Sequence, residues 1–439
     1  MRVRMNRMAW GPSSVMAALT LLAVMLVGQA DVRAETPMIG PLVGHADARS
    51  VILWARLPQA GEYRAAVMPE SAAAREETSV SAEATAARDL TARWRFSNLQ
   101  PHTRYRYEVR DDAGNVLAAN RFRTAPAEDQ PARVSIAFGS CAKEDEGSRA
   151  VWARMMAEDV DGVVLGGDTP YIDSTELATQ RRRYREFAAV PEYRQLLATR
   201  PHWGTWDDHD FGANDADGTL QGKENSRQAF MEYRALASYG DGDEGIYTSF
   251  RWGPLEVFLL DARWWSWTGR SFADPKQKTL LGDAQWQWLQ AGLRTSTAPF
   301  KVLACGVVWD DKQNKEKDDW ETYAHERQAL FDYIRRERIS GVVLFGGDIH
   351  VTRLLKYPAE ATVGYPLHQF ISSPIHARVL PELNVPHPDL IQSSETPNVF
   401  LKLTADARKN PARLTAEFLD RNGKQLFKKV ELNADELAP

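Results

Sequence analysis

Cysteines and long hydrophobic runs are scarce in this sequence, and each scarcity excludes a class of protein. Its 439 residues include two cysteines, which excludes a scaffold held together by several disulfides. After residue 34 no apolar stretch approaches the length of a membrane span. Lysine and arginine form no block and the net charge is −5, which argues against a nucleic-acid surface. We expect no nucleic acid as a specific partner and no stable membrane span in the mature chain.

The N-terminus has the three-part pattern of a secretory signal. Three arginines within the first seven residues precede an apolar run over about residues 15–27, and a short polar stretch ends in Ala34. We expect residues 1–34 to be a signal peptide cleaved after Ala34, with Ala30 as the alternative site. The run is short for a span, so a retained anchor is the less favoured interpretation. The segment has no Arg-Arg pair and no cysteine, so neither the twin-arginine route nor a lipoprotein anchor is indicated. The protein is expected to be exported, to the periplasm or as a secreted protein.

Two domains are expected from the length and from a change of pattern near residue 130. Residues 35–128 contain short strands separated by turn signals, which predicts an all-β domain. The stretch Leu99–Tyr107 resembles the tyrosine corner of fibronectin type III and immunoglobulin-like sandwiches. Over residues 132–439 strands alternate with helical stretches, the pattern of an α/β domain. Helices are expected over about 148–158, 175–199, 223–238, 283–293 and 324–338, and strands return over 399–404, 414–419 and 426–432.

One short pattern occurs twice, far apart in the chain. A β-branched run ends in Gly-Gly-Asp168, and a second such run ends in Gly-Gly-Asp348, with His350 two residues later. Each run is typical of a buried strand, and glycine lets the chain turn where the strand ends. Open α/β sheets bind ligands at this edge, so the pattern favours one metal site built from two halves. Ordinary turns capped by Asp are the alternative, which the repetition and the added histidine disfavour.

Two other strand ends carry unusual residues. The first strand of the α/β domain ends in Phe-Gly-Ser-Cys141, and a later one ends in Trp206-Asp207-Asp208-His209-Asp210. Crowding three carboxylates around one imidazole is costly unless cations neutralise them, although a solvated acidic turn is the alternative. The second cysteine, Cys305, lies in an apolar run where free cysteine behaves as a small hydrophobe. The two cysteines either pair with each other or have separate roles.

These motifs, in this order, resemble those of the PhoD-type alkaline phosphatases, in the calcineurin-like metallophosphoesterase superfamily. The shared elements are Phe-Gly-Ser-Cys, Gly-Asp-x-x-Tyr, Trp-Asp-Asp-His-Asp and Gly-Gly-Asp-x-His, and they extend over most of the mature chain. The resemblance implies an α/β fold: a layered sandwich of two central sheets flanked by helices, preceded by an all-β fibronectin III- or immunoglobulin-like domain. It also implies an exported, metal-dependent phosphatase that hydrolyses small-molecule phosphomonoesters.

The resemblance implies a site that holds Fe3+ and Ca2+. The implied metal ligands are Cys141, Asp168, Tyr171, Asp208, Asn214, Asp348 and His350. Thiolate and phenolate suit iron, whereas carboxylate and amide oxygens suit calcium. Asp168 would bridge iron to a neighbouring cation. Because the signal lacks the Arg pair, metal would be acquired after export or the site would hold other ions. Pairing of Cys141 with Cys305 would remove the thiolate and argue against iron.

Three residues are candidates for catalysis. His209 takes the place of the superfamily's catalytic histidine, which protonates or stabilises the leaving oxygen, and Asp210 is the candidate that orients its ring. A purely structural histidine is the alternative. Arg263 is either a phosphate clamp or a surface ion pair with Asp261. The neighbouring tryptophans Trp264, Trp265 and Trp267 could line a substrate cleft or face a membrane or glycan, but they are expected to be packing residues.

Two other functions also fit the sequence. The same scaffold suits a phosphodiesterase or phospholipase, whose specificity would lie in the loops over residues 310–320 and 374–397. A non-catalytic binding protein of the cell envelope is the other alternative, which retention of the Asp, His, Tyr and Cys set disfavours.

Overall fold

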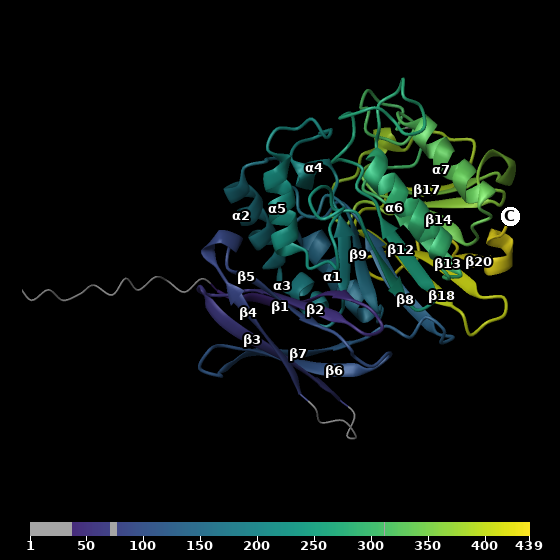
Figure 1. The fold of residues 1–439 in the computed structure, drawn as a ribbon. Helices are drawn as coiled ribbons and strands as arrows, with labels where there is room; N and C mark the ends of the chain where they lie inside the picture. The colour runs from purple at the N-terminus through teal and green to yellow at the C-terminus, as the bar shows by residue number, and fades with distance from the viewer. Residues whose placement is uncertain (1–36, 71–76, 311) are drawn as a thin grey trace, which may run out of the picture. The chain divides into compact units, whose positions relative to one another are not determined.

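The structure is a computed structural model that describes residues 37–70, 77–310 and 312–439 (Figure 1). The expected signal peptide lies outside the described residues. Within the described residues, no helix combines the length and the apolar character that crossing a membrane requires.

The first part of the described chain consists of two antiparallel sheets, which confirms the predicted all-β domain. One sheet has the order β1-β2-β5 and the other β4-β3-β6-β7. The strands are β1 (Ile39–Ala46), β2 (Val51–Arg56), β3 (Gly61–Pro69), β4 (Thr78–Ala84), β5 (Thr91–Phe96), β6 (Arg104–Arg110) and β7 (Val116–Arg123). In β6 Tyr105, Tyr107 and Val109 are buried and alternate with more exposed polar residues, as a half-buried strand requires. The predicted tyrosine corner is present, because the Tyr105 hydroxyl accepts a hydrogen bond from the Gln100 backbone N–H at 2.9 Å.

Two larger mixed sheets pack face to face and form the centre of the second part, as the resemblance implied. Their orders are β10-β9-β8-β18-β19-β20 and β11-β12-β13-β14-β16-β15-β17. The strands of the first are β8 (Arg133–Gly139), β9 (Gly162–Gly166), β10 (His202–Thr205), β18 (Val399–Asp406), β19 (Arg413–Asp420) and β20 (Val430–Asn433). Those of the second are β11 (Thr248–Trp252), β12 (Leu255–Leu259), β13 (Phe300–Ala304), β14 (Val342–Gly346), β15 (Thr352–Tyr357), β16 (Leu367–Ile371) and β17 (Leu390–Ser394). Phe138 of β8 meets Phe345 of β14 with ring centroids 5.2 Å apart, in the core between the sheets.

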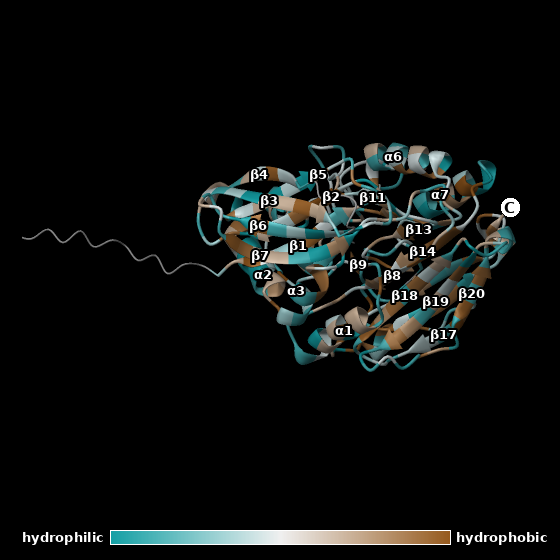
Figure 2. Cartoon of the chain, turned by 90° about the horizontal axis from the view of Figure 1, so that it is seen from below, coloured by the Kyte–Doolittle hydropathy of each residue, from teal (hydrophilic) through white to brown (hydrophobic). Residues whose placement is uncertain are grey.

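Helices flank the sheets (Figure 1). Strands and helices alike carry both hydrophobic and hydrophilic residues (Figure 2). The helices are α1 (Glu146–Ala157), α2 (Leu177–Ala188), α3 (Pro191–Leu197), α4 (Asp208–Phe211), α5 (Lys223–Tyr233), α6 (Gly282–Thr295) and α7 (Ala324–Arg336).

Three boundaries predicted from the sequence are wrong. The helix expected over 175–199 is two helices, because Pro191 opens α3 and forces the residue before it out of helical geometry. The helix expected to reach residue 238 ends at Tyr233, where Arg234 is extended and donates a hydrogen bond to the Tyr193 hydroxyl at 2.6 Å. The last strand begins at Val430 rather than at Leu426.

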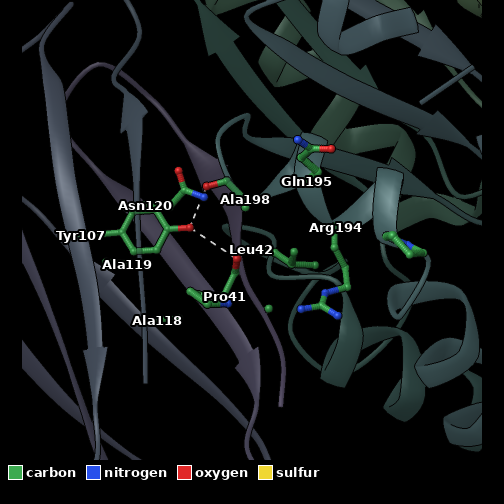
Figure 3. Close-up of a pocket in the computed structure, with 11 residues that line it drawn as sticks. Pro41, Leu42, Tyr107, Ala118, Ala119, Asn120, Arg194, Gln195 and Ala198 are labelled. Atoms are coloured by element: carbon green, nitrogen blue, oxygen red, sulfur yellow. Dashed lines mark hydrogen bonds between the residues drawn. The ribbon is translucent and has the colours of Figure 1, made fainter. Parts of the chain in front are cut away.

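Tyr107 joins the all-β part to the α/β part of the fold. Its hydroxyl, buried at the wall of a cavity of about 430 Å3, donates to the carbonyl of Ala198 at 2.7 Å and lies 3.3 Å from that of Pro41 (Figure 3). Arg194 and Gln195 line the cavity from α3. This cavity contains none of the residues expected to bind metal.

We expect Tyr107→Phe to lower the free energy of unfolding by about 1–2 kcal/mol, because a buried carbonyl loses its donor. Urea unfolding of the two proteins measures the difference. Tyr247→Phe is a matched control: its hydroxyl has no hydrogen bond to any described residue, and its ring is buried. Equal stability of Tyr107→Phe and the unmodified chain would contradict the role given to this hydroxyl.

Candidate metal centre

The carboxyl ends of strands from both central sheets deliver the predicted site residues to one place. Cys141 follows β8, Asp168 follows β9, Asp208 follows β10, and Asp348 with His350 follows β14. Strands β8, β9 and β10 are parallel to one another, as are β12, β13, β14 and β16, so their ends lie at one edge of each sheet.

Cys141, Asp168 and His350 form the first of three linked clusters of metal-type donors. Their donor atoms all lie within 4.8 Å of one another, and all three side chains are buried. The Cys141 sulfur lies 3.6 Å from Asp168 Oδ2 and accepts a hydrogen bond from Ser373 Oγ at 3.1 Å. A thiol, a carboxylate and an imidazole in this arrangement are donors that suit a transition metal.

Tyr171 lies beside this cluster, and its hydroxyl group contacts two histidines. Its hydroxyl oxygen lies 2.8 Å from Nε2 of His350 and 3.0 Å from Nε2 of His376. His376 was not predicted from the sequence, although it follows β16 in a Ser-Ser-Pro-Ile-His stretch. Applying the strand-end rule to that strand as well would have found it.

The other two clusters share members with the first and with each other. Asp168, Asp208 and His209 form the second cluster, and Asp208, Asp215 and Asp318 form the third. Asp168 therefore belongs to the first and second clusters, and Asp208 to the second and third. Asn214 is exposed, as is its neighbour Asp215, which belongs to the third cluster. The role of Asn214 as a metal ligand stays a prediction.

Four of the expected ligands have backbone angles that L-residues rarely adopt. The φ angles are 57° at Cys141, 54° at Asp168, 67° at Asp348 and 53° at His350. Each residue lies in the sharp turn directly after its strand. Left-handed geometry at non-glycine residues costs energy and is concentrated at functional sites, so these turns place donors at the expense of backbone strain.

The cationic side chains of Lys312 and Arg263 neutralise carboxylates at and beside the third cluster. The Lys312 ammonium lies 2.6 Å from Asp318 Oδ1 and 2.8 Å from Asp348 Oδ2. Arg263 donates to Asp318 Oδ2 at 2.9 Å and, through Nε, to Asp207 Oδ1 at 2.8 Å. Burial lowers the pKa of Lys312, but the carboxylates of Asp348 and Asp318 raise it well above its usual value.

Arg263 differs from both alternatives offered by the sequence. It is 1% exposed, so it is not a surface ion pair with Asp261. Its guanidinium is shared among Asp207, Asp318 and the carbonyl of Ala216, which leaves it little freedom to clamp a phosphate. The geometry favours a buried counter-ion that holds the carboxylates in place.

Within the described residues no lysine or arginine forms an ion pair with the first cluster, and two of its polar atoms have no hydrogen-bond partner. Asp168 Oδ1 and His350 Nδ1 are buried and have no hydrogen-bond partner among the described residues. Burial, followed by repulsion from Asp208 and Asp210, raises the pKa of Asp168 well above its usual value. Burial lowers the pKa of His350 to about 3, so its imidazole is neutral, the form that binds metals. A bound cation would satisfy both atoms, and the residues present therefore fit a metal ion.

His209 has a different partner from the one expected. Its Nδ1 lies 2.5 Å from Asp173 Oδ1, while its ring packs on Tyr171 with centroids 4.4 Å apart. Asp210, the predicted orienter, is at the third position of α4 and accepts from the backbone N–H groups of Asp207 and Asp168 instead. At this position of a helix the Asp210 carboxylate caps the first turn of α4, so it does not contact the His209 ring.

The two cysteines are free and buried at different places. Cys305 lies 3.1 Å from the carbonyl of Val307 and accepts a hydrogen bond from Trp320 Nε1 at 3.4 Å. The pairing alternative is therefore absent from this structure, and the Cys141 sulfur is free to face Asp168.

Comparison with known proteins identifies the family. A family model described as "PhoD-like phosphatase" matches residues 136–411, and its N-terminal domain model matches residues 29–126. The chain belongs to the PhoD-like phosphatase family. Alkaline phosphatase D of Bacillus subtilis (strain 168) is 26% identical over 306 residues, which cover 58% of this chain and 52% of that protein. The chain thus matches about half the length of this curated relative.

Two solved structures share the fold of this PhoD-like chain. A structure of PhoD superposes with a TM-score of 0.72 at 19% identity, covering 89% of this chain and 92% of that one. A purple acid phosphatase from yellow lupin seeds gives a TM-score of 0.68 at 12% identity, covering 90% and 74%. At these identities the comparison concerns the fold alone.

We expect Arg263→Met to lower the free energy of unfolding by about 3–5 kcal/mol, because Asp207 and Asp318 would keep buried charges without their partner. Urea unfolding measures this, with Arg270→Met as the control, since Arg270 is exposed. Unchanged stability with a loss of catalytic efficiency would instead indicate an arginine that binds substrate.

Proposed function

We propose that this protein is an exported, metal-dependent phosphatase that hydrolyses small-molecule phosphomonoesters. The observation that supports it best is the arrangement of three donor clusters, in which Asp168 and Asp208 each belong to two clusters. A carboxylate shared in this way suits two neighbouring cations, which would bind the same phosphoryl group. Family membership supports the same reaction class. The signal-like N-terminus supports export to the periplasm or the medium, with residues 35–128 and 132–439 as the two mature domains.

The proposed ligands divide by donor chemistry. Cys141, Asp168 and His350, with Tyr171 beside them, suit Fe3+, because thiolate, phenolate and imidazole favour a transition metal. Asp208, Asp215 and Asp318 offer only oxygen, which suits Ca2+. Asp348 is a further candidate ligand, although Lys312 holds its Oδ2 at 2.8 Å. Bound cations at these residues supply Lewis-acid activation of the phosphoryl group and of the attacking oxygen.

His209 is the proposed acid for the leaving oxygen. Asp173 engages Nδ1, so Nε2 is the nitrogen left to face a substrate. The Tyr171 ring at 4.4 Å limits how the imidazole tilts. Asp210 keeps the α4 turn in place through its backbone hydrogen bonds and so positions His209 indirectly.

The decisive experiment is hydrolysis of nitrophenyl phosphate and of the matching diester by the chain from Glu35 onward, with and without iron and calcium. We expect metal-dependent turnover of the monoester, and Asp168→Asn should abolish it and reduce the iron bound per chain. Asp159→Asn is the matched control, because that side chain is 91% exposed at the opposite end of β9. Turnover of the diester alone would indicate a phosphodiesterase or phospholipase. Folded, metal-loaded protein inactive on both would favour a binding protein.

We expect Asp173→Asn to lower kcat by about 10–100-fold with little change in KM, because it alters the support of a catalytic group and not substrate binding. Steady-state kinetics measure both constants, and metal content should stay unchanged. A rise in KM alone would contradict the orienting role.

A further inference from the structure

A small cavity adjoins the third donor cluster. Its volume is about 260 Å3. Asp215 and Asp318 belong both to the cluster and to the cavity lining, which also includes Arg263, Asp217, Trp267, Leu280 and Tyr323. A phosphoryl group at the cluster would therefore have the rest of its molecule beside an aromatic and aliphatic wall.

Trp267 packs against the hydrophobic core and, unlike its neighbours Trp264 and Trp265, also lines this cavity. Of the three clustered tryptophans, Trp264 is 4% exposed and stacks on Trp206, and Trp265 packs on Tyr247. Trp267 is partly exposed, and no other described aromatic ring contacts its own. All three tryptophans contact the hydrophobic core, as expected, with Trp265 and Trp267 both partly exposed, and of the three only Trp267 lines the cavity.

The backbone of Trp267 is also strained. Its φ is 62°, a left-handed angle that is a genuine outlier for so bulky a residue. Its N–H donates to the carbonyl of Thr279 at 3.0 Å, which ties the turn to the chain that leads into α6. Strain of this kind persists where the surrounding structure enforces it, and it is concentrated at ligand sites.

The polar groups of the cavity match a phosphate ester with a flat alcohol. Lys317 is exposed at the lining and makes no ion pair with a described residue. The Tyr323 hydroxyl has no hydrogen-bond partner in the described part of the chain, although the residue is 2% exposed. A cavity of 260 Å3 is slightly below the size range of drug-sized ligands, about 300–1,000 Å3, and so suits a single ring better than a polymer.

We propose that this cavity binds the alcohol part of the substrate and that Trp267 stacks on an aromatic ring there, so that the protein prefers phosphate monoesters of small aromatic alcohols. This inference rests on the proposed phosphatase function. Trp267 is then a specificity-determining residue, since it contacts the alcohol and not the reacting phosphorus. Aromatic stacking of this kind changes affinity by about 2–10-fold beyond the area that it buries.

The test compares phenyl phosphate with glycerol phosphate as substrates of the metal-loaded chain from Glu35 onward. We expect a preference for phenyl phosphate that Trp267→Ala reduces by about tenfold, through KM and with kcat retained. Calorimetric binding of phenylphosphonate, which is not hydrolysed, should weaken by a similar factor. Trp286→Ala is the matched control, because Trp286 stacks on Phe272 outside the cavity.

A second variant keeps the test valid if alanine impairs folding. Trp267→Gly accepts the left-handed backbone without strain and removes the same ring. Active Trp267 variants with unchanged substrate preference and unchanged phenylphosphonate affinity would overturn this inference and leave the phosphatase function standing. Failure of the unmodified protein to hydrolyse either ester would instead overturn the proposed function, and this inference with it.

Discussion

Buried negative charge is the constraint on which the rest of this site depends. Asp168, Asp207, Asp208 and Asp210 are each at most 3% exposed, within one short stretch of the fold. Such crowding is stable only when cations or hydrogen bonds compensate each carboxylate. Lys312 and Arg263 compensate one side, and backbone N–H groups compensate Asp210. Among the described residues Asp168 Oδ1 and His350 Nδ1 have no hydrogen-bond partner, and neither has Asp207 Oδ2 beside Arg263, so the compensation is incomplete and a cation near Asp168 would add to it.

The architecture explains how so many like charges come together. Cys141, Asp168, Asp208, Asp348 and His350 follow the carboxyl ends of strands, and two sheets packed face to face bring two sets of strand ends to one edge. Left-handed turns at Cys141, Asp168 and His350 then direct the side chains that follow the strands. The packed core of the two sheets holds the backbone of these turns in its strained conformation. The cavity walled by Trp267 lies at the same edge, beside the third cluster.

Prediction from sequence succeeded where a residue's position in the fold follows from its own strand. Cys141, Asp168, Asp208 and His350 each follow a recognisable buried run, so the sequence pattern was enough to predict that they converge. The family and the two-sheet fold class, which were predicted from the same strand-end motifs, were confirmed by the comparisons. Partners from other segments were not predictable: Asp173 lies beside His209 where Asp210 was expected, and Asp318 joins Asp208 and Asp215 in the third cluster. In both cases the distance between side chains depends on loop geometry that local pattern does not encode.

The sequence by itself determined which chemistry was available: two Gly-Gly-Asp turns, a cysteine at a strand end, and an acidic run around one histidine. These follow from local rules of strand, turn and donor type, which operate over a few residues. Only the tertiary structure decided which charges meet, because contacts such as that of Lys312 with Asp348, or of Arg263 with Asp207, join residues 36 and 56 positions apart. It likewise placed Trp267, but neither Trp264 nor Trp265, in the lining of a cavity, since a cavity is formed by segments from several parts of the fold.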